Sequence, residues 1–484
     1  MSSVNPAEPP PPAAAVEPLP NGFGVPAALL ALAAPIIASM VSRTAMNFVD
    51  FVMVSQLGTE AQAAVVPAGI LLFCFIAFGF GMLSAVNTYV SQALGRGDAW
   101  GCASYGWQGF WLGIGLGGVI LPAYFGVPAF FAWVGHEPAV AEMETIYARI
   151  GIIGMAPTLA GAALANFAQG VHRPAVGFWA MLIANLFNVA GNYALIFGHW
   201  GFPAMGIAGA AWATTLAATL QMLVLLAWLV GPSVAAQFPT RRAWRLDLRR
   251  MRQLLWLGAP AGVHFVVDVV AFTVFTLLMV GRFGTQQLAA SNIAFKLLEL
   301  SFMPGIGLGA ALTVAVGKAI GRGRPDHARL VTRWAAGLCV AYMGAVGLSY
   351  AVFGEQLARL LSPDTANPDP VVIAWARRLL LLAAVFQMFD ALNIVHISAL
   401  RGAGDNHVPA AMAATMVVTL LIGGGFAAVY LMPQWGAAGP WIAATAYVVV
   451  LGLGMWARWH FGPWERIDLH GKSEGRIGDS APAV

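Results

Sequence analysis

A few charged residues lie in stretches of the chain that are otherwise apolar, and these are the residues whose types could do chemistry. Only 10% of the 484 residues are charged. The clearest cases inside apolar runs are Arg43, Asp50, Asp268, Lys296, Glu299 and Asp390. An ionisable side chain at the centre of a membrane-spanning helix raises the free energy of insertion by about 2.5–3.5 kcal/mol, so each needs a functional or structural reason.

The three aspartates have the chemistry of coupling-ion carriers. Removal from water disfavours the charged form of a carboxylate, so a buried aspartate can take up a proton on one side of a membrane and release it on the other. The same carboxylate, with a few neutral oxygens, can hold a sodium ion. The alternative is structural, a buried ion pair or a hydrogen-bonded carboxyl that fixes packing. We favour ion coupling for Asp50, Asp268 and Asp390.

Other polar residues in the apolar runs support or neutralise such acids. Lys296 and Glu299 are three residues apart, so they can meet on one helix face, and we favour a structural ion pair there. Asn188 and Asn192 lie one helical turn apart, and Gln387 lies three residues before Asp390. Amides supply hydrogen bonds to a carboxylate without adding charge. Hydrogen bonding between helices is the alternative role of these amides.

The elements that position these residues are predicted to be membrane helices. Hydrophobic residues make up 59% of the chain, and its charged fraction is far below the roughly 25% of a soluble domain. Many apolar runs are long enough to cross a hydrocarbon core of about 30 Å. We therefore predict an all-α membrane protein with about twelve spans, at residues 26–54, 62–92, 104–133, 142–168, 175–198, 205–230, 252–281, 287–319, 331–353, 374–399, 409–431 and 437–460.

The chain is an internal duplication. Pro35 in LAAP recurs as Pro260 in LGAP, and Gly58 recurs as Gly284, both with nearly the same offset. A constant offset over a long stretch indicates a repeated half. Duplicated apolar halves are typical of secondary transporters, whose substrate site lies between the repeats. Because proline lacks a backbone donor, we expect the first and seventh spans to bend at Pro35 and Pro260.

Lysine and arginine fix the expected orientation. Basic residues gather in the links after the even-numbered spans, including Arg96, Arg173, Arg401 and a cluster between residues 241 and 252. The positive-inside rule then places both termini in the cytoplasm. We expect a disordered Pro-rich tail, an N-lobe of six helices, a basic linker against anionic lipid headgroups, a C-lobe of six helices and a cytoplasmic tail, at residues 1–22, 23–231, 232–251, 252–461 and 462–484.

Several motifs, in this order and spacing, resemble those of one family. They are LAAP followed by MNFVDFVMVSQLG, then SQALGRGD, NVAGNYALIFG and GIAGAAWAT, and in the second half PAGVHFVVDVV and FQMFDALNIVHISALRGAGD. Over residues 26–460 the chain resembles the multidrug and toxic compound extrusion (MATE) transporters, most closely their bacterial NorM-like branch.

The resemblance implies two six-helix bundles that face each other across a central cleft and work by alternating access. It also implies export of large, planar, mostly cationic organic compounds in exchange for sodium ions or protons. The cation-coupling residues that it implies are, in the N-lobe, Asp50, Asn188, Asn192 and Thr214, and in the C-lobe, Asp268 and Asp390. A sodium ion is possible at Asp50 or at Asp268 and Asp390.

The sequence departs from the family pattern at three places. Asn192 stands where some members have aspartate, and Asp268 stands where NorM-like members usually have glutamate. Lys296 and Glu299 stand where the pattern is commonly uncharged. A lysine ammonium near Asp268 or Asp390 could take the place of sodium, which favours protons slightly as the coupling ion.

A cleft with carboxylates on an apolar, aromatic wall suits lipophilic cations through charge and ring contacts. The candidate wall residues are Phe48, Phe51, Phe265, Gln387, Met388 and Phe389. Contact with lipid or with the protein core is the alternative place for such side chains.

We therefore predict a multi-pass antiporter of the bacterial cytoplasmic (inner) membrane, monomeric, that exports organic cations. It is expected to use no cofactor other than its coupling ion and to bind no nucleic acid. The main alternative is a flippase for lipids or lipid-linked oligosaccharides, which would line the cleft with arginine and lysine. A membrane-embedded enzyme is a third class, but His264 and His396 alone do not make a catalytic constellation.

Overall fold

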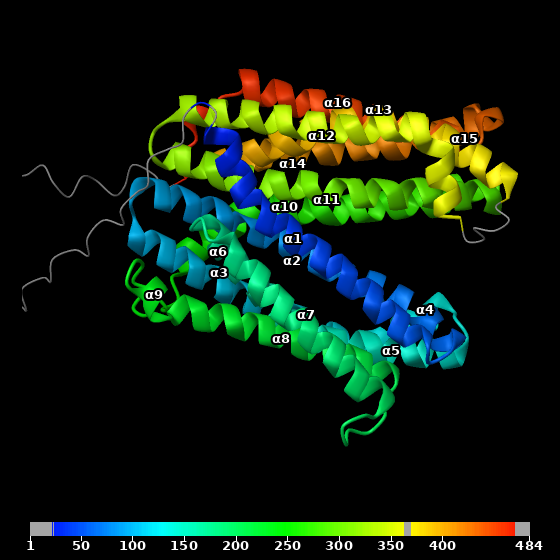
Figure 1. Ribbon diagram of the computed structural model, residues 1–484, viewed down its shortest axis with the longest axis horizontal. Helices are drawn as coiled ribbons and strands as arrows, with labels where there is room; N and C mark the ends of the chain where they lie inside the picture. The colour runs from blue at the N-terminus through cyan, green and yellow to red at the C-terminus, as the bar shows by residue number, and fades with distance from the viewer. Residues whose placement is uncertain (1–21, 23, 363–368, 470–484) are drawn as a thin grey trace, which may run out of the picture.

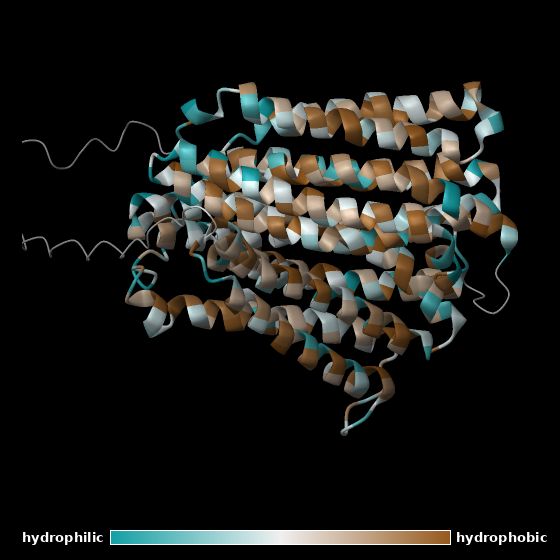
Figure 2. Cartoon of the chain, turned by 45° about the horizontal axis from the view of Figure 1, so that its top comes forward, coloured by the Kyte–Doolittle hydropathy of each residue, from teal (hydrophilic) through white to brown (hydrophobic). Residues whose placement is uncertain are grey.

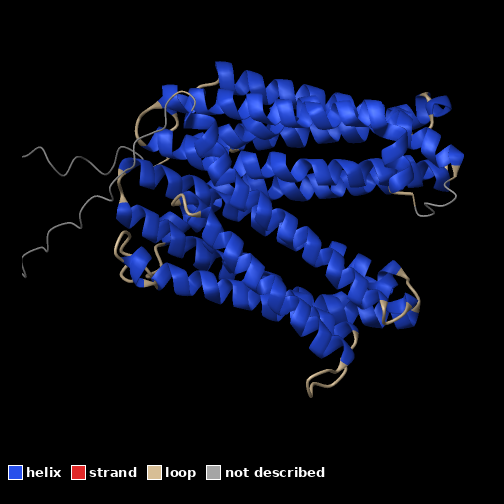
Figure 3. Ribbon diagram, viewed as in Figure 1, coloured by secondary structure: helices blue, strands red, loops and turns tan. Residues whose placement is uncertain are grey.

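The structure is a computed structural model that describes residues 22, 24–362 and 369–469. Within this part of the chain every regular element is a helix (Figure 3). Ten helices are long and apolar enough to cross a membrane, and the number rises to twelve if each of two bent pairs forms one span. Hydrophobic residues prevail along the middle of the helices, and hydrophilic residues gather at their two ends (Figure 2). The predicted all-α membrane fold is confirmed.

The first half of the chain forms the N-lobe. Its helices are α1 (Gly24–Ser55), α2 (Thr59–Arg96), α3 (Ala99–Ile120), α4 (Ala123–Val134), α5 (Pro138–Ile153), α6 (Met155–Gly170), α7 (Pro174–Phe197), α8 (Ile207–Val230) and the short α9 (Pro232–Ala235). The α3–α4 and α5–α6 pairs are bent by 49° and 46°. Pro122, which cannot donate a backbone hydrogen bond, lies at the first break, and Gly154 lies at the second.

The second half forms the C-lobe. Its helices are α10 (Leu248–Val274), η1 (Phe275–Met279), η2 (Val280–Phe283), α11 (Thr285–Gly321), α12 (Pro325–Leu360), α13 (Pro370–Ala403), α14 (His407–Met416), η3 (Val417–Gly423), α15 (Gly424–Leu431), η4 (Pro433–Trp435), α16 (Ala438–Phe461) and η5 (Trp464–Arg466). Two π-helical stretches, η1 and η3, continue the helices before them. Pro35 and Pro260 lie inside α1 and α10, which are each continuous, so the bends expected there stay predictions.

The two lobes meet at the end of the molecule where the described chain begins and ends, here called the terminal end. Toward the opposite end α1, α7 and α8 diverge from α10–α16 (Figure 1). The contact at the terminal end is close because glycines line it. A Cβ atom at Gly95 would lie 2.3 Å from the Lys318 carbonyl oxygen, and one at Gly258 would lie 2.1 Å from the Met82 carbonyl oxygen. Small residues of this kind let helix backbones approach in membrane bundles.

The duplication is visible in the same contact. A Cβ at Gly317 of α11 would meet the Ser91 hydroxyl of α2. These two residues are separated by the repeat offset, so the two copies of one helix pack against each other. A contact between equivalent residues agrees with an approximate two-fold relation of the lobes around α2 and α11.

The first helix of each lobe divides its packing between both lobes. Val25, Leu29 and Ala33 of α1 belong to the apolar core of the C-lobe, whereas the later part of α1 packs on α7. Correspondingly, Leu254 and Leu257 of α10 belong to the core of the N-lobe. Each first helix thus crosses from one lobe to the other along its length.

The segment that joins the lobes is fixed to the N-lobe. Trp107 of α3 donates its indole N–H to the Thr240 carbonyl over 2.7 Å, and Trp111 donates to the Trp244 carbonyl over 2.9 Å. α10 begins at Leu248, so the last residues of the predicted linker belong to that helix. Apart from Gly22, the disordered tail expected at residues 1–22 lies outside the described residues, as do residues 470–484 of the tail expected at 462–484.

Candidate functional site

An acidic cluster lies inside the N-lobe where α1, α7 and α8 meet. The Asn192 amide donates to Asp50 Oδ1 over 2.5 Å and to Asn188 Oδ1 over 3.1 Å. The Asn188 amide donates to the Thr214 hydroxyl over 3.2 Å. All four residues expected for the N-lobe site are therefore together, and Asn188 and Asn192 are fully buried. Their role in ion coupling stays a prediction.

The N-lobe cluster contains a buried oxygen atom without a hydrogen-bond partner. Asn192 Oδ1 is buried and accepts no hydrogen bond. The Thr214 hydroxyl lies next to the Asp50 carboxylate. Among the described residues no basic side chain forms an ion pair with Asp50, and Arg43 instead lies over the Phe80 ring, 5.3 Å from its centroid. One carboxylate with one unpartnered amide oxygen and a neighbouring hydroxyl fits either a proton or a dehydrated sodium ion.

A second acidic cluster lies inside the C-lobe. Asp268 of α10 lies 3.3 Å from His264 Nε2, one turn earlier on the same helix. Asp390 of α13 accepts a hydrogen bond from Asn393 over 3.1 Å. The two acids interact with each other electrostatically, and Tyr447 of α16 lies beside both. The structure thus brings together the two acids expected for the C-lobe site.

Asp268 is the more exposed of the two acids. Its side chain is 31% exposed, although its Oδ1 atom is buried and accepts no hydrogen bond. Asp390, at 8% exposed, is deeper inside the C-lobe.

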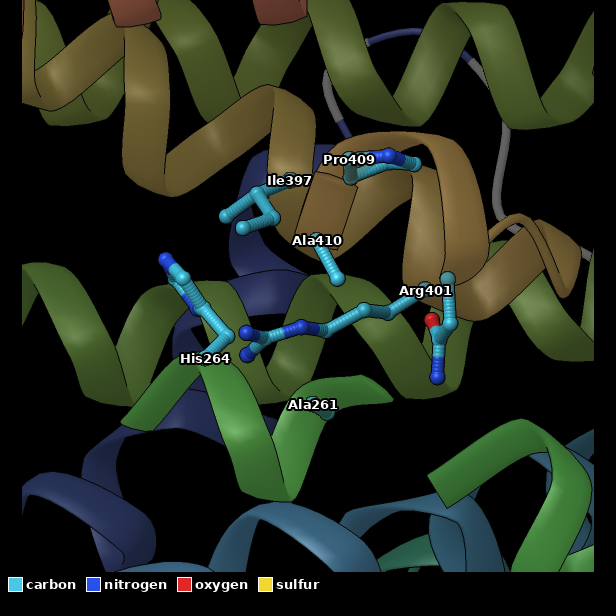
Figure 4. Close-up of a pocket in the computed structure, with 7 residues that line it drawn as sticks. Ala261, His264, Ile397, Arg401, Pro409 and Ala410 are labelled. Carbon is cyan, nitrogen blue, oxygen red and sulfur yellow. The ribbon is translucent and has the colours of Figure 1, made fainter. Parts of the chain in front are cut away.

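Arg401 is the main correction to the sequence analysis. The sequence placed it in a cytoplasmic link, but it belongs to the last turn of α13. Its guanidinium lies 5.6 Å from the Phe265 ring centroid and interacts electrostatically with Asp268. Arg401 and His264 line a small cavity between α10, α13 and α14 (Figure 4). The sequence carries no signal for this orientation, because a side chain at a helix end can point either to water or back along the helix.

Lys296 and Glu299 form the expected ion pair, with Nζ and Oε2 2.9 Å apart. Both side chains are more than half exposed. The suggestion that Lys296 neutralises a C-lobe acid is not supported, because the cation beside Asp268 is Arg401.

The six side chains expected to line the substrate cleft differ in exposure. Phe48, Phe265 and Met388 are exposed, and Phe51 and Phe389 are half-buried. Gln387 is fully buried and donates a hydrogen bond to the Ser301 hydroxyl. In this conformation Gln387 is therefore part of the C-lobe interior.

Comparison with known families decides the class of protein. The MatE family model matches this chain twice, over residues 35–194 and 260–426, once in each half and each time from the repeated proline. The chain belongs to the MATE family. It is a multi-pass membrane transporter and not an enzyme, as the sequence predicted.

Relatives and solved structures agree with this membership. The chain is 31% identical over 391 residues to "Probable multidrug resistance protein NorM" of Agrobacterium fabrum, covering 80% of this chain and 83% of the relative. It is 33% identical over 409 residues to "Multidrug resistance protein PmpM" of Pseudomonas aeruginosa, covering 81% and 80%. A solved MATE transporter in an outward-facing conformation has the same fold, with a TM-score of 0.81 at 20% identity, covering 91% of this chain and 98% of that one. The NorM-like resemblance is thereby confirmed.

Proposed function

We propose that this MATE transporter exports lipophilic organic cations from a bacterial cell in exchange for protons or sodium ions. The observation that carries the proposal is the pair of acidic clusters, one in each lobe. In each, a carboxylate is bonded to neutral amide or hydroxyl groups rather than locked in an arginine or lysine ion pair within 4 Å. Such acids remain able to exchange a bound ion. The multidrug resistance names of the relatives support an organic cargo.

The orientation follows from the basic residues. Arg96, Arg173 and the arginines of the linker belong to the terminal end, so the positive-inside rule makes that end cytoplasmic. The lobes are in contact there and separate toward the opposite end, so we infer an outward-open state. The membrane would be the inner membrane of a bacterium. Both acidic clusters and the contact between lobes belong to one chain, which supports function as a monomer.

Exchange follows from competition for the same negative charge. In the outward-open state a coupling ion from outside neutralises an acid and weakens its attraction for an organic cation, which leaves. After the lobes rearrange, the ion leaves to the cytoplasm and the acid regains its charge. It then attracts a new organic cation. Because each ligand weakens the binding of the other by the same factor, a downhill ion can drive the drug uphill.

The exposed side chains suit a lipophilic cation. Phe48, Phe265 and Met388 offer apolar and aromatic surface, and an aromatic face attracts a cation more strongly when water is excluded. A flippase for diphosphate-linked lipids would need free basic side chains in the cleft. Here the exposed Lys296 is paired with Glu299, and Arg401 lies beside Asp268.

The two clusters differ in their suitability for sodium. The N-lobe cluster has neutral oxygens and no nearby basic group, so it suits either ion. In the C-lobe the positive charge of Arg401 disfavours either cation at Asp268, because like charges repel strongly when they are removed from water. We propose protons at Asp268 and Asp390, because a proton bonds directly to a carboxylate oxygen and needs no further ligand oxygens, and leave the N-lobe open to either ion.

Dye export into everted vesicles tests the proposal. The vesicles are energised by a pH gradient alone and then by a sodium gradient alone, with Asp50→Asn and Asp390→Asn as comparison variants. We expect at least one gradient to drive transport by the natural chain, and each variant to abolish it at equal expression. Dye movement that responds to neither gradient, or that persists in both variants, would contradict ion-coupled export.

A further inference from the structure

The last turn of α13 connects the C-lobe acids with the contact between the lobes. On one side, the Arg401 side chain runs back to α10. Its guanidinium lies over the Phe265 ring and interacts electrostatically with Asp268. It also lies beside the main-chain end of the His264 side chain (Figure 4). Within 4 Å, no acidic side chain pairs with Arg401 in the described part of the chain. The guanidinium is therefore held by a longer-range attraction that depends on the charge of the nearby acid.

On the other side, the backbone of the same turn is bonded to the N-lobe. The Thr88 hydroxyl of α2 donates to the Arg401 carbonyl over 3.0 Å. The Gln92 amide of α2 donates to the Gly402 carbonyl, also over 3.0 Å. Both bonds cross between lobes at the closed, terminal end. Within its own lobe the turn packs closely on α11, since a Cβ at Gly402 would lie 2.6 Å from the Thr313 carbonyl oxygen.

We propose that Arg401 is a positioning residue that transmits ion loading of the C-lobe acids to the contact between the lobes. While Asp268 is charged, it holds the guanidinium inside the lobe, and the last turn of α13 keeps its bonds to Thr88 and Gln92. When the acid is neutralised by its coupling ion, the guanidinium loses its counter-charge in an apolar environment. It moves toward water at the terminal end, the turn moves with it, and the inter-lobe bonds break.

This inference rests on the proposed function, because it requires the acids to be loaded with ions. Its direction agrees with the antiport cycle. The coupling ion binds the C-lobe acids from outside while the transporter is open to the outside. Binding of the ion then releases the contact that closes the cytoplasmic side. The transporter would thereby open inward only after it has taken up its ion.

Few other titratable groups face Arg401. α10 contributes Asp268 and His264, and Asp390 of α13 and Tyr447 of α16 act through Asp268. α14 contributes only Pro409 and Ala410 to the cavity wall. Protonation of His264 would add positive charge beside the guanidinium and push it in the same direction as protonation of the acid. Acid is therefore expected only to weaken the contact between the lobes, whichever of these groups takes up the proton.

A surface arginine at the same end of the N-lobe supplies a control. Arg173 lies after α6, at the N-terminal cap of α7, and donates to Gln237 over 2.9 Å. Its neighbour His172 lies at the closed end, where burial and the nearby Lys318 lower its pKa to about 3. His172 therefore stays neutral between pH 5 and pH 8 and does not contribute to a pH response in that range.

The experiment measures the distance between the lobes at the terminal end. Spin labels are placed by Ser233→Cys on α9 and Arg324→Cys after α11, both at exposed positions. The native cysteines Cys74, Cys102 and Cys339 are replaced by serine or alanine. The distance distribution in detergent is compared at pH 8 without sodium, at pH 5, and at pH 8 with sodium.

We expect acid to increase the long-distance population of the labelled chain several-fold, and Asp268→Asn to give the acid distribution already at pH 8. Arg401→Gln should give one distribution at both pH values. Arg401→Lys, which keeps the charge, should retain part of the response, and Arg173→Gln should behave as the unmodified pair. A monodisperse elution profile and a thermal melt establish that each variant is folded.

Two outcomes would overturn the inference. One is an Arg401→Gln distance distribution that changes between pH 8 and pH 5 as the parent's does. The other is a distance distribution of the labelled parent that changes neither with acid nor with sodium. The vesicle assay tests ion-coupled export, and the distance measurement tests the link through Arg401, so the two proposals can be refuted separately. If neither gradient drives dye export but the distances respond to acid through Arg401, ion-coupled export is wrong and the link through Arg401 stands. If export is gradient-driven but Arg401→Gln responds normally, only the link is wrong.

Discussion

Removal of the Asp50 charge gives the sharpest test of the N-lobe cluster. Asp50→Asn keeps the size of the side chain and leaves Asn192, Asn188 and Thr214 in place. At a separation of about 4 Å and an effective dielectric constant of about 20, a carboxylate attracts a bound cation by about 4 kcal/mol. Loss of that attraction corresponds to roughly a thousandfold weaker ion binding.

The effect of Asp50→Asn on folding should be much smaller. The bond from Asn192 to the carboxylate, 2.5 Å long, is charge-assisted. Such bonds contribute about 1.5–3 kcal/mol against about 0.5–1.5 kcal/mol for a neutral bond, so the substitution costs about 1 kcal/mol of stability. We therefore expect normal expression and a small change in melting temperature, with ion-driven dye efflux reduced to background.

Asn185 provides the matched control for this test. It lies on the same helix as Asn192, is buried, and donates to the Ser42 hydroxyl and backbone carbonyl of α1, the latter over 3.0 Å. Asn185→Ala removes hydrogen bonds between the same two helices without touching the acid. It should reduce stability by about 1 kcal/mol per bond but keep efflux. Efflux at the parental rate in Asp50→Asn, or equal loss in Asn185→Ala, would refute the reasoning from charge.

Three further substitutions have defined outcomes. Asp390→Asn should abolish proton-driven efflux at normal expression, measured with the vesicle assay; activity above half of the parent would contradict a coupling role. Gly95→Ala places a Cβ 2.3 Å from the Lys318 carbonyl, so it should destabilise the closed terminal end by about 1–3 kcal/mol, seen as more long-distance population between the two spin labels. Lys296→Met should change stability by at most about 1 kcal/mol, because the pair with Glu299 is exposed, and should leave the sodium response of efflux unchanged.

Part of the N-lobe cluster was predictable because its geometry is local. Asn188 and Asn192 are one turn apart, so any helix over that run places them together, and they are bonded to each other as the spacing indicates. The bond from Asn192 to Asp50 joins α7 to α1, and the family resemblance rather than spacing predicted that these residues belong together. The spans were predictable for a similar reason, since length and hydropathy determine which segments can cross a bilayer.

The C-lobe was less predictable because its geometry depends on tertiary contacts. The two acids lie on helices far apart in the sequence, and the family resemblance rather than spacing brought them together. Arg401 was assigned to a link because it stands at the end of an apolar run next to Gly402. The direction in which the Arg401 side chain points is determined by packing between α10 and α13. The periodicity of the sequence does not predict that packing.

The division of α1 and α10 between the lobes has a mechanical consequence. The first part of α1 packs in the C-lobe core, and its later part carries Asp50 on the N-lobe side. α10 is arranged in the opposite sense and carries Asp268. If the lobes move relative to each other, each of these helices must bend or slide between its two attachments. Pro35 and Pro260 lie near those crossings, where a missing backbone hydrogen bond makes bending easiest. In both halves, therefore, the helix that carries an acid also connects the lobes, so the ion site and the moving part are joined by a single element.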